Sequence, residues 1–408
     1  MDKVIPVIVT MDTKGPEGLF LKDFIERQGF DALVIDVGTR ESRFAPDYPY
    51  EVVAECAGVT LEELGAMRRD NMMRTMGEGA SQILLDFWAA GKLAGVISIG
   101  GNQGTSIASF AMEALPVGIP KLIISTVASG NIRPYVGYKD IMMMFSVFDF
   151  VGGINSIGKT ILSNGAGAVI GMAQHGIPFT ADKRKTVGIT AFGNTDMAVS
   201  LARQLLEKKG YEVIAFHASG AGGSAMEYLV EQGYIQGVLD LTTHELLGEK
   251  WGDDIYTPLR PRLTEAVKKG IPLVVCPGAI EYFCFGGPET IPQKYLGRKT
   301  HYHNPYNTNV RATAEELKET GEFLISKLNL SKGKTAVCIP LKGFSANGKE
   351  GGALYEPETD QVLIDILEEK LEEKIPLVKV RANINDPVFA ETAVDFLIKY
   401  MEEEKENG

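Results

Sequence analysis

A glycine-rich turn, Ser98 to Thr105 (SIGGNQGT), combines residue types that bind phosphate groups. It follows an apolar run and opens a segment with helical periodicity, so the first N–H groups of a helix would face a ligand at this turn. Glycines allow close backbone approach, and the hydroxyls of Thr105 and Ser106 are candidates for contacts to a phosphate or to Mg²⁺. Taken alone, the turn is equally compatible with a tight strand-to-helix connection that binds nothing.

Three further expected strand ends would converge on this turn: Thr10 to Lys14 (TMDTK), Asp36 to Thr39 (DVGT) and Ser125 to Asn131 (STVASGN). In open parallel sheets, ligands bind beyond the carboxyl ends of the strands. Lys14 would neutralise phosphate charge, and Asp36 would accept a hydrogen bond from a ribose hydroxyl. The alternatives are a solvated loop lysine and a carboxylate that caps a turn.

A literal P-loop pattern, GxxxxGK[ST], occurs at Gly153 to Thr160 (GINSIGKT). A P-loop requires a preceding hydrophobic strand. The methionine-rich run from Ile141 to Phe150 fits a strand, a helix or a buried loop equally well, and the segment from Lys159 to Ala173 indicates a closely packed helix. We therefore expect the match to be coincidental, with Asn155 and Ser156 lining the same cleft.

Polar side chains also follow the expected strands of the second half of the chain. The stretches 216–224, 240–245 and 276–279 are such strand ends, and residues 298–311 (RKTHYHNPYNTNVR) read as a loop without hydrophobic period. These segments supply the candidate catalytic residues, which are His217, Asp240, Glu245, Arg298, His301 and His303.

A metal site built from these residues is not what we expect. His301 and His303 are two residues apart in an extended loop, and we expect them to point to opposite sides, which disfavours a site that uses both. One of them with Asp240 or Glu245 is the alternative. We expect arginine and histidine to bind an anion or a carboxylate instead.

The elements that position these residues alternate in the manner of a parallel sheet. Residues 4–10, 17–28 and 32–37 read as strand, helix and strand, and the same rhythm continues through residue 125. The polar stretch 180–186 (TADKRKT) interrupts it, so we place a domain boundary at Ala181, between domains 1–181 and 182–408. The predicted fold class is α/β, with two Rossmann-like doubly wound domains, mostly parallel sheets and a cleft between them.

The second half restarts like the first. Residues 7–13 (VIVTMDT) are echoed by 187–195 (VGITAFGNT), and each segment is followed by an expected helix and a second strand. Two related halves follow from this echo. Further strands are expected at 237–241, 271–276, 335–340 and 377–380, so the second sheet should have about six strands.

Composition excludes several classes of protein. The formal charge of −12 offers no basic face for nucleic acid. The four cysteines form no CxxC pair, which is typical of reduced cytoplasmic thiols. The chain opens directly into an expected strand, and no apolar run is long enough to span a membrane, so we expect a cytoplasmic protein without membrane contact.

Several ordered motifs resemble one family. They are TMDTKGPE, DVGTRES, GGNQGTSIAS, STVASGNIRPYVG, INSI, HASGAGGSAME, DLTTHEL, HNP and NINDPVFA. Together they are similar to the bacterial relatives of the ATP-binding inhibitory domain of the tomato mosaic virus resistance protein, an otherwise uncharacterised family, over nearly the whole chain. The resemblance implies a two-domain Rossmann-like fold, a homodimer, and ATP with Mg²⁺ in the first domain.

The resemblance and the strand-end map together assign the nucleotide-binding residues. These are Thr13, Lys14, Gly38, Thr39, Gly100, Gly101, Asn102, Gly104, Thr105, Ser125, Thr126, Val127, Asn155 and, from across the cleft, Gly220. The function that follows is that of an ATP-dependent enzyme acting on a small carboxylate or carbonyl substrate in the inter-domain cleft. The alternative is a non-catalytic ATP-sensing module that regulates a protein partner. A dinucleotide-dependent oxidoreductase is disfavoured because GGNQG does not fit GxGxxG.

Overall fold

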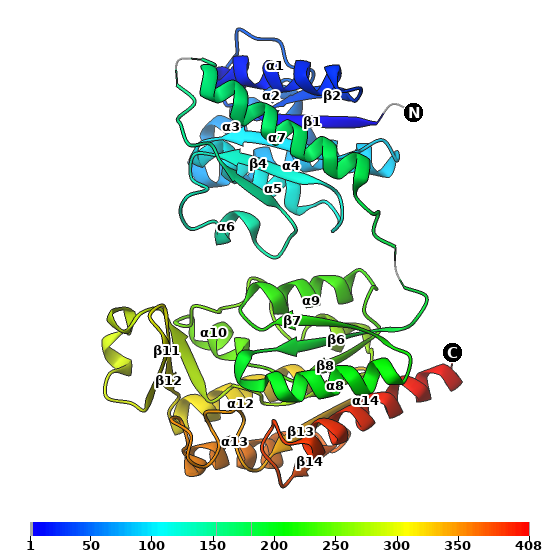
Figure 1. Cartoon of the computed structure of the whole chain (residues 1–408), viewed down its shortest axis with the longest axis vertical. Coiled ribbons are helices and arrows are strands. Elements are labelled where there is room, and N and C mark those ends of the chain that lie inside the picture. The colour runs from blue at the N-terminus through cyan, green and yellow to red at the C-terminus, as the bar shows by residue number, and fades with distance from the viewer. Residues whose placement is uncertain (1–2, 152, 181, 408) are drawn as a thin grey trace. The chain divides into compact units, whose positions relative to one another are not determined.

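The computed structural model describes residues 3–151, 153–180 and 182–407, with side chains up to residue 403. The chain divides into two compact units at residues 180 and 181 (Figure 1). The predicted boundary residue, Ala181, lies outside the described residues. Both units are α/β with parallel main sheets, which confirms the predicted fold class.

The first unit is built on a five-stranded sheet in the order β2-β1-β3-β4-β5, with every neighbouring pair parallel. Its strands are β1 (Val4–Val9), β2 (Asp31–Asp36), β3 (Val96–Gly100), β4 (Lys121–Ser125) and β5 (Met142–Phe145). Its helices are α1 (Met11–Arg27), α2 (Tyr50–Cys56), α3 (Leu61–Ala66), α4 (Arg69–Ala89), α5 (Asn102–Glu113), α6 (Arg133–Val136) and α7 (Ser156–His175).

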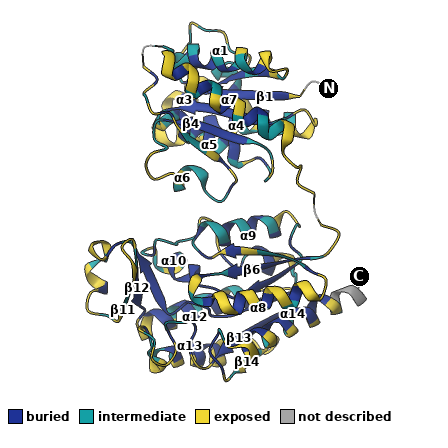
Figure 2. Ribbon diagram, in the orientation of Figure 1, coloured by how far each residue is buried: buried dark blue, intermediate teal, exposed yellow. Residues whose placement is uncertain are grey.

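Helices cover both faces of this sheet. Leu21 of α1 and Leu162 of α7 pack with Val7 in one apolar cluster, while Ile83 of α4 and Ile107 of α5 belong to a second cluster on the opposite face. The continuous apolar sequence of β1 follows from this double cover, because a strand that is buried on both faces needs no polar alternation. Figure 2 shows the buried strands between helices whose outer sides are exposed.

The second unit has a six-stranded parallel sheet in the order β14-β13-β9-β8-β6-β7, as the sequence predicts. Its strands are β6 (Thr186–Ala191), β7 (Glu212–His217), β8 (Gly237–Asp240), β9 (Leu273–Val275), β13 (Thr335–Pro340) and β14 (Leu377–Val380). Its helices are α8 (Asp196–Lys208), α9 (Ala221–Glu231), α10 (Glu245–Trp251), α11 (Glu265–Lys269), α12 (Ala314–Leu328), α13 (Pro357–Lys370) and α14 (Pro387–Asn407).

The two sheets repeat one topology. In each unit the first strand lies between the second and the third, and the fourth follows outward, so β6, β7, β8 and β9 take the places of β1, β2, β3 and β4. The internal repeat read from the sequence is therefore confirmed at the level of strand order. Each sheet has a switch point, where the chain turns from building one side of the sheet to building the other. It lies between β1 and β3 in the first unit and between β6 and β8 in the second.

A three-stranded antiparallel sheet in the second unit was not expected. It has the order β10-β12-β11, with β10 at Tyr282–Phe285, β11 at Thr300–Asn304 and β12 at Asn307–Arg311. The prediction that residues 298–311 form a loop is therefore wrong. The segment shows no apolar alternation because β11 is largely exposed, while β12 buries polar side chains such as Asn309 and Arg311.

No helix in the described part of the chain combines the length and the apolar composition needed to cross a membrane.

Candidate functional site

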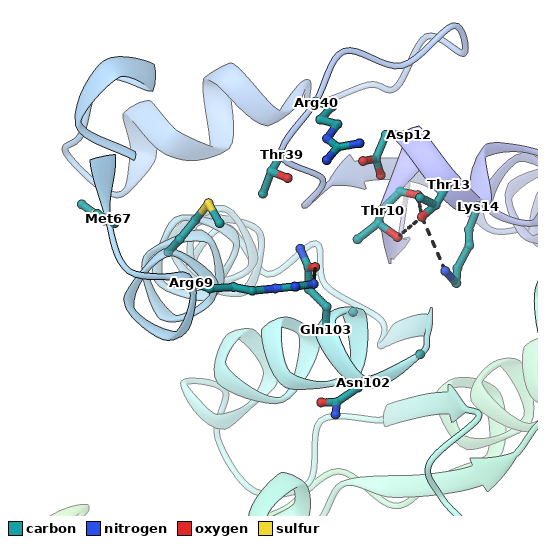
Figure 3. A pocket seen from close by; sticks show the side chains of 13 residues that line it. Thr10, Asp12, Thr13, Lys14, Thr39, Arg40, Met67, Arg69, Asn102 and Gln103 are labelled. Atoms are coloured by element: carbon teal, nitrogen blue, oxygen red, sulfur yellow. Dashed lines mark hydrogen bonds between the residues drawn. The ribbon is translucent and has the colours of Figure 1, made fainter. Parts of the chain in front are cut away.

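A cavity of about 640 Å³ opens at the switch point of the first unit (Figure 3). The residues that follow β1, β2 and β3 line it, together with the start of α4, which is the place where open parallel sheets bind ligands. The lining residues are Thr10, Asp12, Thr13, Lys14, Thr39, Arg40, Met67, Arg69, Met72, Gly101, Asn102, Gln103 and Gly104.

The glycine-rich turn forms one wall of this cavity. Strand β3 ends at Gly100, Gly101 is the N-cap residue, and α5 begins at Asn102, so the first N–H groups of the helix have no acceptor within the helix itself. Gly100 is required for packing, because a Cβ there would lie 2.7 Å from the main-chain nitrogen of Thr105. The strand–turn–helix context predicted for the turn is confirmed.

The hydroxyls of this turn point away from the cavity. Thr105 Oγ1 lies 2.6 Å from Ser125 Oγ, both side chains are fully buried, and Ser125 Oγ also accepts from the N–H of Val127. Ser106 Oγ donates to the carbonyl of Asn102 at 3.0 Å. These hydroxyls therefore hold α5 to β4 and to its own first turn.

Asp36 caps the turn beside the cavity. Its Oδ1 accepts the N–H of Met11 at 2.9 Å and the N–H of Gly38 at 2.8 Å. Burial raises the pKa of Asp36 to about 6, against the two N–H donors, which lower it. Of the two alternatives for Asp36, the turn cap describes its Oδ1, which accepts both N–H groups.

The charge around the cavity is predominantly positive. Lys14, Arg40 and Arg69 line it, whereas Asp12 is the acidic residue among its described lining side chains. Arg69 Nη2 donates to Gln103 Oε1 at 2.9 Å, which holds the guanidinium at the first turn of α5. Cationic side chains next to a helix N-terminus attract phosphate oxygens.

Asp12 lies in the first turn of α1, and Oδ1 of its carboxylate is buried without a hydrogen-bond partner among the described residues. In Figure 3, Asp12 lies on the same side of the cavity as Arg40. An unpartnered carboxylate oxygen is a candidate ligand for Mg²⁺, because Mg²⁺ is commonly held by one or two carboxylates together with substrate phosphates.

Six of the predicted nucleotide-binding residues line the cavity, namely Thr13, Lys14, Thr39, Gly101, Asn102 and Gly104. The other eight are not among its lining residues: Gly38, Gly100, Thr105, Ser125, Thr126, Val127, Asn155 and Gly220. Asn155 instead caps α7, because its Oδ1 accepts the N–H of Gly158 at 2.7 Å.

The second half of the P-loop match, from Ser156 onward, lies in α7. Gly158, Lys159 and Thr160 lie in the first turns of this helix, and ten residues separate its start at Ser156 from the end of β5 at Phe145. A P-loop passes directly from strand to helix around the phosphates. Lys159 is exposed and does not line the cavity.

Asp240 and Glu245, two of the predicted catalytic residues, belong to a buried ion-pair network in the second unit. Arg262 is at its centre, with Nη2 2.8 Å from Asp240, Nε 2.6 Å from Glu245 and Nη1 2.6 Å from Glu227. The Arg262 side chain is 1% exposed. Glu245 also accepts the N–H of Gly220, so this network fixes the turn before α9.

The remaining candidates of the second unit are spread over several elements. Arg298 forms an ion pair with Glu316 at 2.7 Å. His217 ends β7 with part of its side chain exposed to solvent, and partial desolvation of its ring, together with the nearby His244, lowers its pKa.

His301 and His303 lie on β11 with their ring centroids 6.0 Å apart. The expectation that they point to opposite sides is wrong, because residues i and i+2 of a strand share one face.

Three arginines that line the cavity or neutralise buried carboxylates were not identified from the sequence. Arg40 is one residue beyond a predicted strand end, so its place in the sequence could have identified it as a candidate for the cavity. Arg69 reaches the cavity from a different helix, and Arg262 lies in a segment without periodic pattern. No sequence signal places either of these two.

Comparison with known proteins gives a consistent assignment over both units. The model described as the N-terminal domain of the uncharacterised protein family UPF0261 matches residues 3–177, and that of its C-terminal domain matches residues 184–401. A UPF0261 protein of Clostridium tetani is 44% identical over 405 residues, covering 98% of this chain and 100% of that protein.

The ToMV resistance protein Tm-1(GCR237) of Solanum lycopersicum is 37% identical over 416 residues, covering 96% of this chain. This chain spans 55% of the length of the tomato protein. Among solved structures, UDP-GlcNAc 2-epimerase of Methanocaldococcus jannaschii, crystallised with UDP-GlcNAc and UDP, aligns over 97% of this chain and 92% of that one. Its TM-score of 0.22 and 9% identity carry no functional argument.

Proposed function

This chain belongs to the UPF0261 family, and we propose that its first unit binds ATP with Mg²⁺, with the phosphates in the switch-point cavity. One observation carries the proposal. The N-terminal turns of α1 and α5 open on the same cavity as Lys14, Arg40 and Arg69, in a chain whose net charge is −12. A concentration of positive charge at two helix starts fits a polyanion.

Different lining residues would bind different parts of such a ligand. The N–H groups at the start of α5 and the two arginines would bind phosphate oxygens, with Gln103 holding Arg69 in place. Asp12 would hold Mg²⁺ through its unpartnered oxygen, and the ion would neutralise part of the phosphate charge.

A regulatory role suits this geometry better than a defined chemical step. Asp240, Glu245 and Arg298 are engaged in ion pairs, which leaves His217, His301 and His303 from the predicted catalytic set. The relative named as a ToMV resistance protein is compatible with a module that responds to nucleotide and acts on a partner. We therefore place nucleotide-dependent regulation first, and ATP-dependent turnover of a small carboxylate or carbonyl compound second.

Thermal unfolding of the full chain with and without Mg-ATP tests the binding. A ligand at 100 times its Kd stabilises the folded state by about 2.7 kcal/mol. Replacement of Lys14 by Ala should reduce the shift, whereas replacement of Lys159 by Ala, outside the cavity, should leave it unchanged. No shift at millimolar Mg-ATP would refute the proposal. Release of ADP stimulated by a small acid would favour the enzyme over the regulator.

A further inference from the structure

Three potential metal ligands meet inside the second unit. His244 follows β8, Asp254 lies in the loop after α10, and Cys284 is on β10; all three residues are buried. One donor atom from each lies within 4.8 Å of the other two. Apolar and aromatic side chains surround them, among them Phe192 and Tyr282, so these polar groups sit in a poorly solvated environment.

The imidazole of His244 is oriented as in a metal ligand. Its Nδ1 lies 2.8 Å from the carbonyl oxygen of Ala279, and its ring stacks on Phe192 with the centroids 5.0 Å apart. An N–H donated from Nδ1 to a carbonyl leaves Nε2 with its lone pair, the arrangement usual for histidines that bind metals. Nε2 is buried and faces Asp254 Oδ2 at 3.2 Å, although no contact of Nε2 among the described residues has the geometry of a hydrogen bond.

Asp254 and Cys284 are fixed relative to each other by their backbones. The N–H of Cys284 donates to Asp254 Oδ2 at 2.6 Å, and the N–H of Ile255 donates to the carbonyl of Cys284 at 3.0 Å. The N–H of Tyr256 donates to the other oxygen of Asp254 at 2.7 Å. Main-chain N–H groups thus hold both oxygens of the carboxylate, and ligating carboxylates are commonly hydrogen-bonded in this way.

The spacing of these atoms suits a tetrahedral ion. With bonds of about 2.0–2.3 Å, Zn²⁺ holds neighbouring ligand atoms about 3.3–3.6 Å apart. His244 Nε2 and Asp254 Oδ2 are 3.2 Å apart. Very little movement of these side chains is therefore needed to place both on one ion.

The antiparallel sheet offers a candidate for a fourth donor. Asn309 of β12 is directly opposite Cys284 of β10 in the ladder, so both side chains leave the sheet on the same face. The Asn309 side chain is buried, and its Oδ1 has no hydrogen-bond partner in the part of the chain that the structure describes. Asn309 is therefore the candidate for a fourth ligand beside Cys284.

We infer that His244, Asp254 and Cys284 form a binding site for a Zn²⁺-type transition metal ion, with Asn309 as the fourth ligand. One nitrogen, one sulfur and oxygens are donors that Zn²⁺ accepts, whereas Mg²⁺ and Ca²⁺ prefer oxygen alone. Binding displaces the thiol proton of Cys284, so a thiolate and a carboxylate neutralise the 2+ charge. A neutral centre suits the apolar surroundings. The ion would tie the antiparallel sheet to the end of β8.

Metal analysis of the full chain tests this site. We expect about one zinc per chain after purification, and we expect Co²⁺ added to metal-free protein to give the charge-transfer absorption of a cobalt–thiolate bond. Cys284→Ser should abolish that absorption. Cys338→Ser should retain it, because Cys338 is a buried cysteine of β13 outside the cluster. If Cys284→Ser fails to fold, Asp254→Asn serves in its place, with reduced zinc content expected.

The histidine pair on β11 is the competing site. A variant with His301→Ala and His303→Ala should keep its zinc and its cobalt–thiolate band if the buried site binds the metal. Loss of metal in that variant, with metal retained in Cys284→Ser, would overturn the inference. So would wild-type protein that binds neither ion. These outcomes are independent of nucleotide binding, because the cluster lies in the second unit and the switch-point cavity in the first.

Discussion

Arg69 at the start of α4 donates a hydrogen bond from Nη2 to Oε1 of Gln103, 2.9 Å away in the first turn of α5. This bond joins two helices that are adjacent in space but 34 residues apart at these positions, and it sets a guanidinium at the edge of the cavity. In the proposed complex with ATP, the same guanidinium has donors left for phosphate oxygens, because arginine carries five N–H groups.

Arg69→Ala is therefore expected to weaken Mg-ATP binding by about 10- to 150-fold, as a hydrogen bond to a charged group contributes about 1.5–3 kcal/mol. Isothermal titration of the full chain measures the change. Arg203→Ala is the matched control, because Arg203 is an exposed arginine of the second unit paired with Glu207. Equal affinity in wild type and Arg69→Ala would exclude a phosphate contact by Arg69.

Asp12→Asn tests whether Asp12 is a ligand of Mg²⁺. If Asp12 holds Mg²⁺, this variant should lose most of the difference in affinity between ATP with Mg²⁺ and ATP with EDTA, while its affinity for ATP in EDTA should stay equal or rise. The last effect follows because the substitution removes a negative charge next to the phosphates. Titrations under both conditions give the comparison. An unchanged response to Mg²⁺ would place the ion elsewhere.

Asp36→Asn changes how stability depends on pH. The pKa of Asp36 is about 6 in the folded protein, above its unfolded value, so its contribution is full below about pH 4 and is lost as the pH rises through 6. Wild type should lose about 2–3 kcal/mol from this group between pH 4 and pH 7, whereas the asparagine variant keeps an acceptor for Met11 and does not titrate.

Unfolding of both proteins across this range measures the difference. Asp47→Asn is a suitable control, because Asp47 is a partly exposed carboxylate that pairs with Lys22 in the same unit. Parallel curves for wild type and Asp36→Asn would show that folding does not raise the pKa of Asp36.

Arg262→Met tests the buried ion-pair network. Three carboxylates, those of Glu227, Asp240 and Glu245, would lose their shared cation, and breaking a buried pair costs about 3–5 kcal/mol. Urea unfolding of the variant should show a loss of this size, and Arg203→Met, at an exposed pair, a loss under about 1 kcal/mol. Similar losses of unfolding free energy in the two variants would show that Arg262 stabilises the fold no more than an exposed arginine does.

The sequence was sufficient to predict much of the first unit and one wall of its cavity. Gly101 and Gly104 follow the buried strand β3, and in a parallel sheet all strands end at the same edge, so convergence with Lys14 and Thr39 could be predicted from topology alone. The place of Arg69 at this cavity could not be predicted in the same way, because it depends on how the chain between β2 and β3 folds back over the sheet.

The second unit was harder to read at its polar positions. Asp240 and Glu245 follow a strand as catalytic carboxylates do, but Arg262 neutralises both from a segment with no regular pattern. The sequence did not indicate that His244 belongs to a cluster, because its neighbours Asp254 and Cys284 are brought to it by an antiparallel sheet. The polar sequences of two of the strands of that sheet, β11 and β12, do not have the pattern of strands.

The most direct test of the nucleotide proposal is a titration of the full chain with ATP in the presence of Mg²⁺, carried out on wild type and on a variant with Lys14, Arg40 and Arg69 all replaced by Ala. We predict saturable binding by wild type and a loss of at least a hundredfold in affinity for the triple variant, with its thermal unfolding in the absence of ligand unchanged. Binding of equal affinity by both proteins, or none by wild type, would contradict the assignment of the switch-point cavity to ATP.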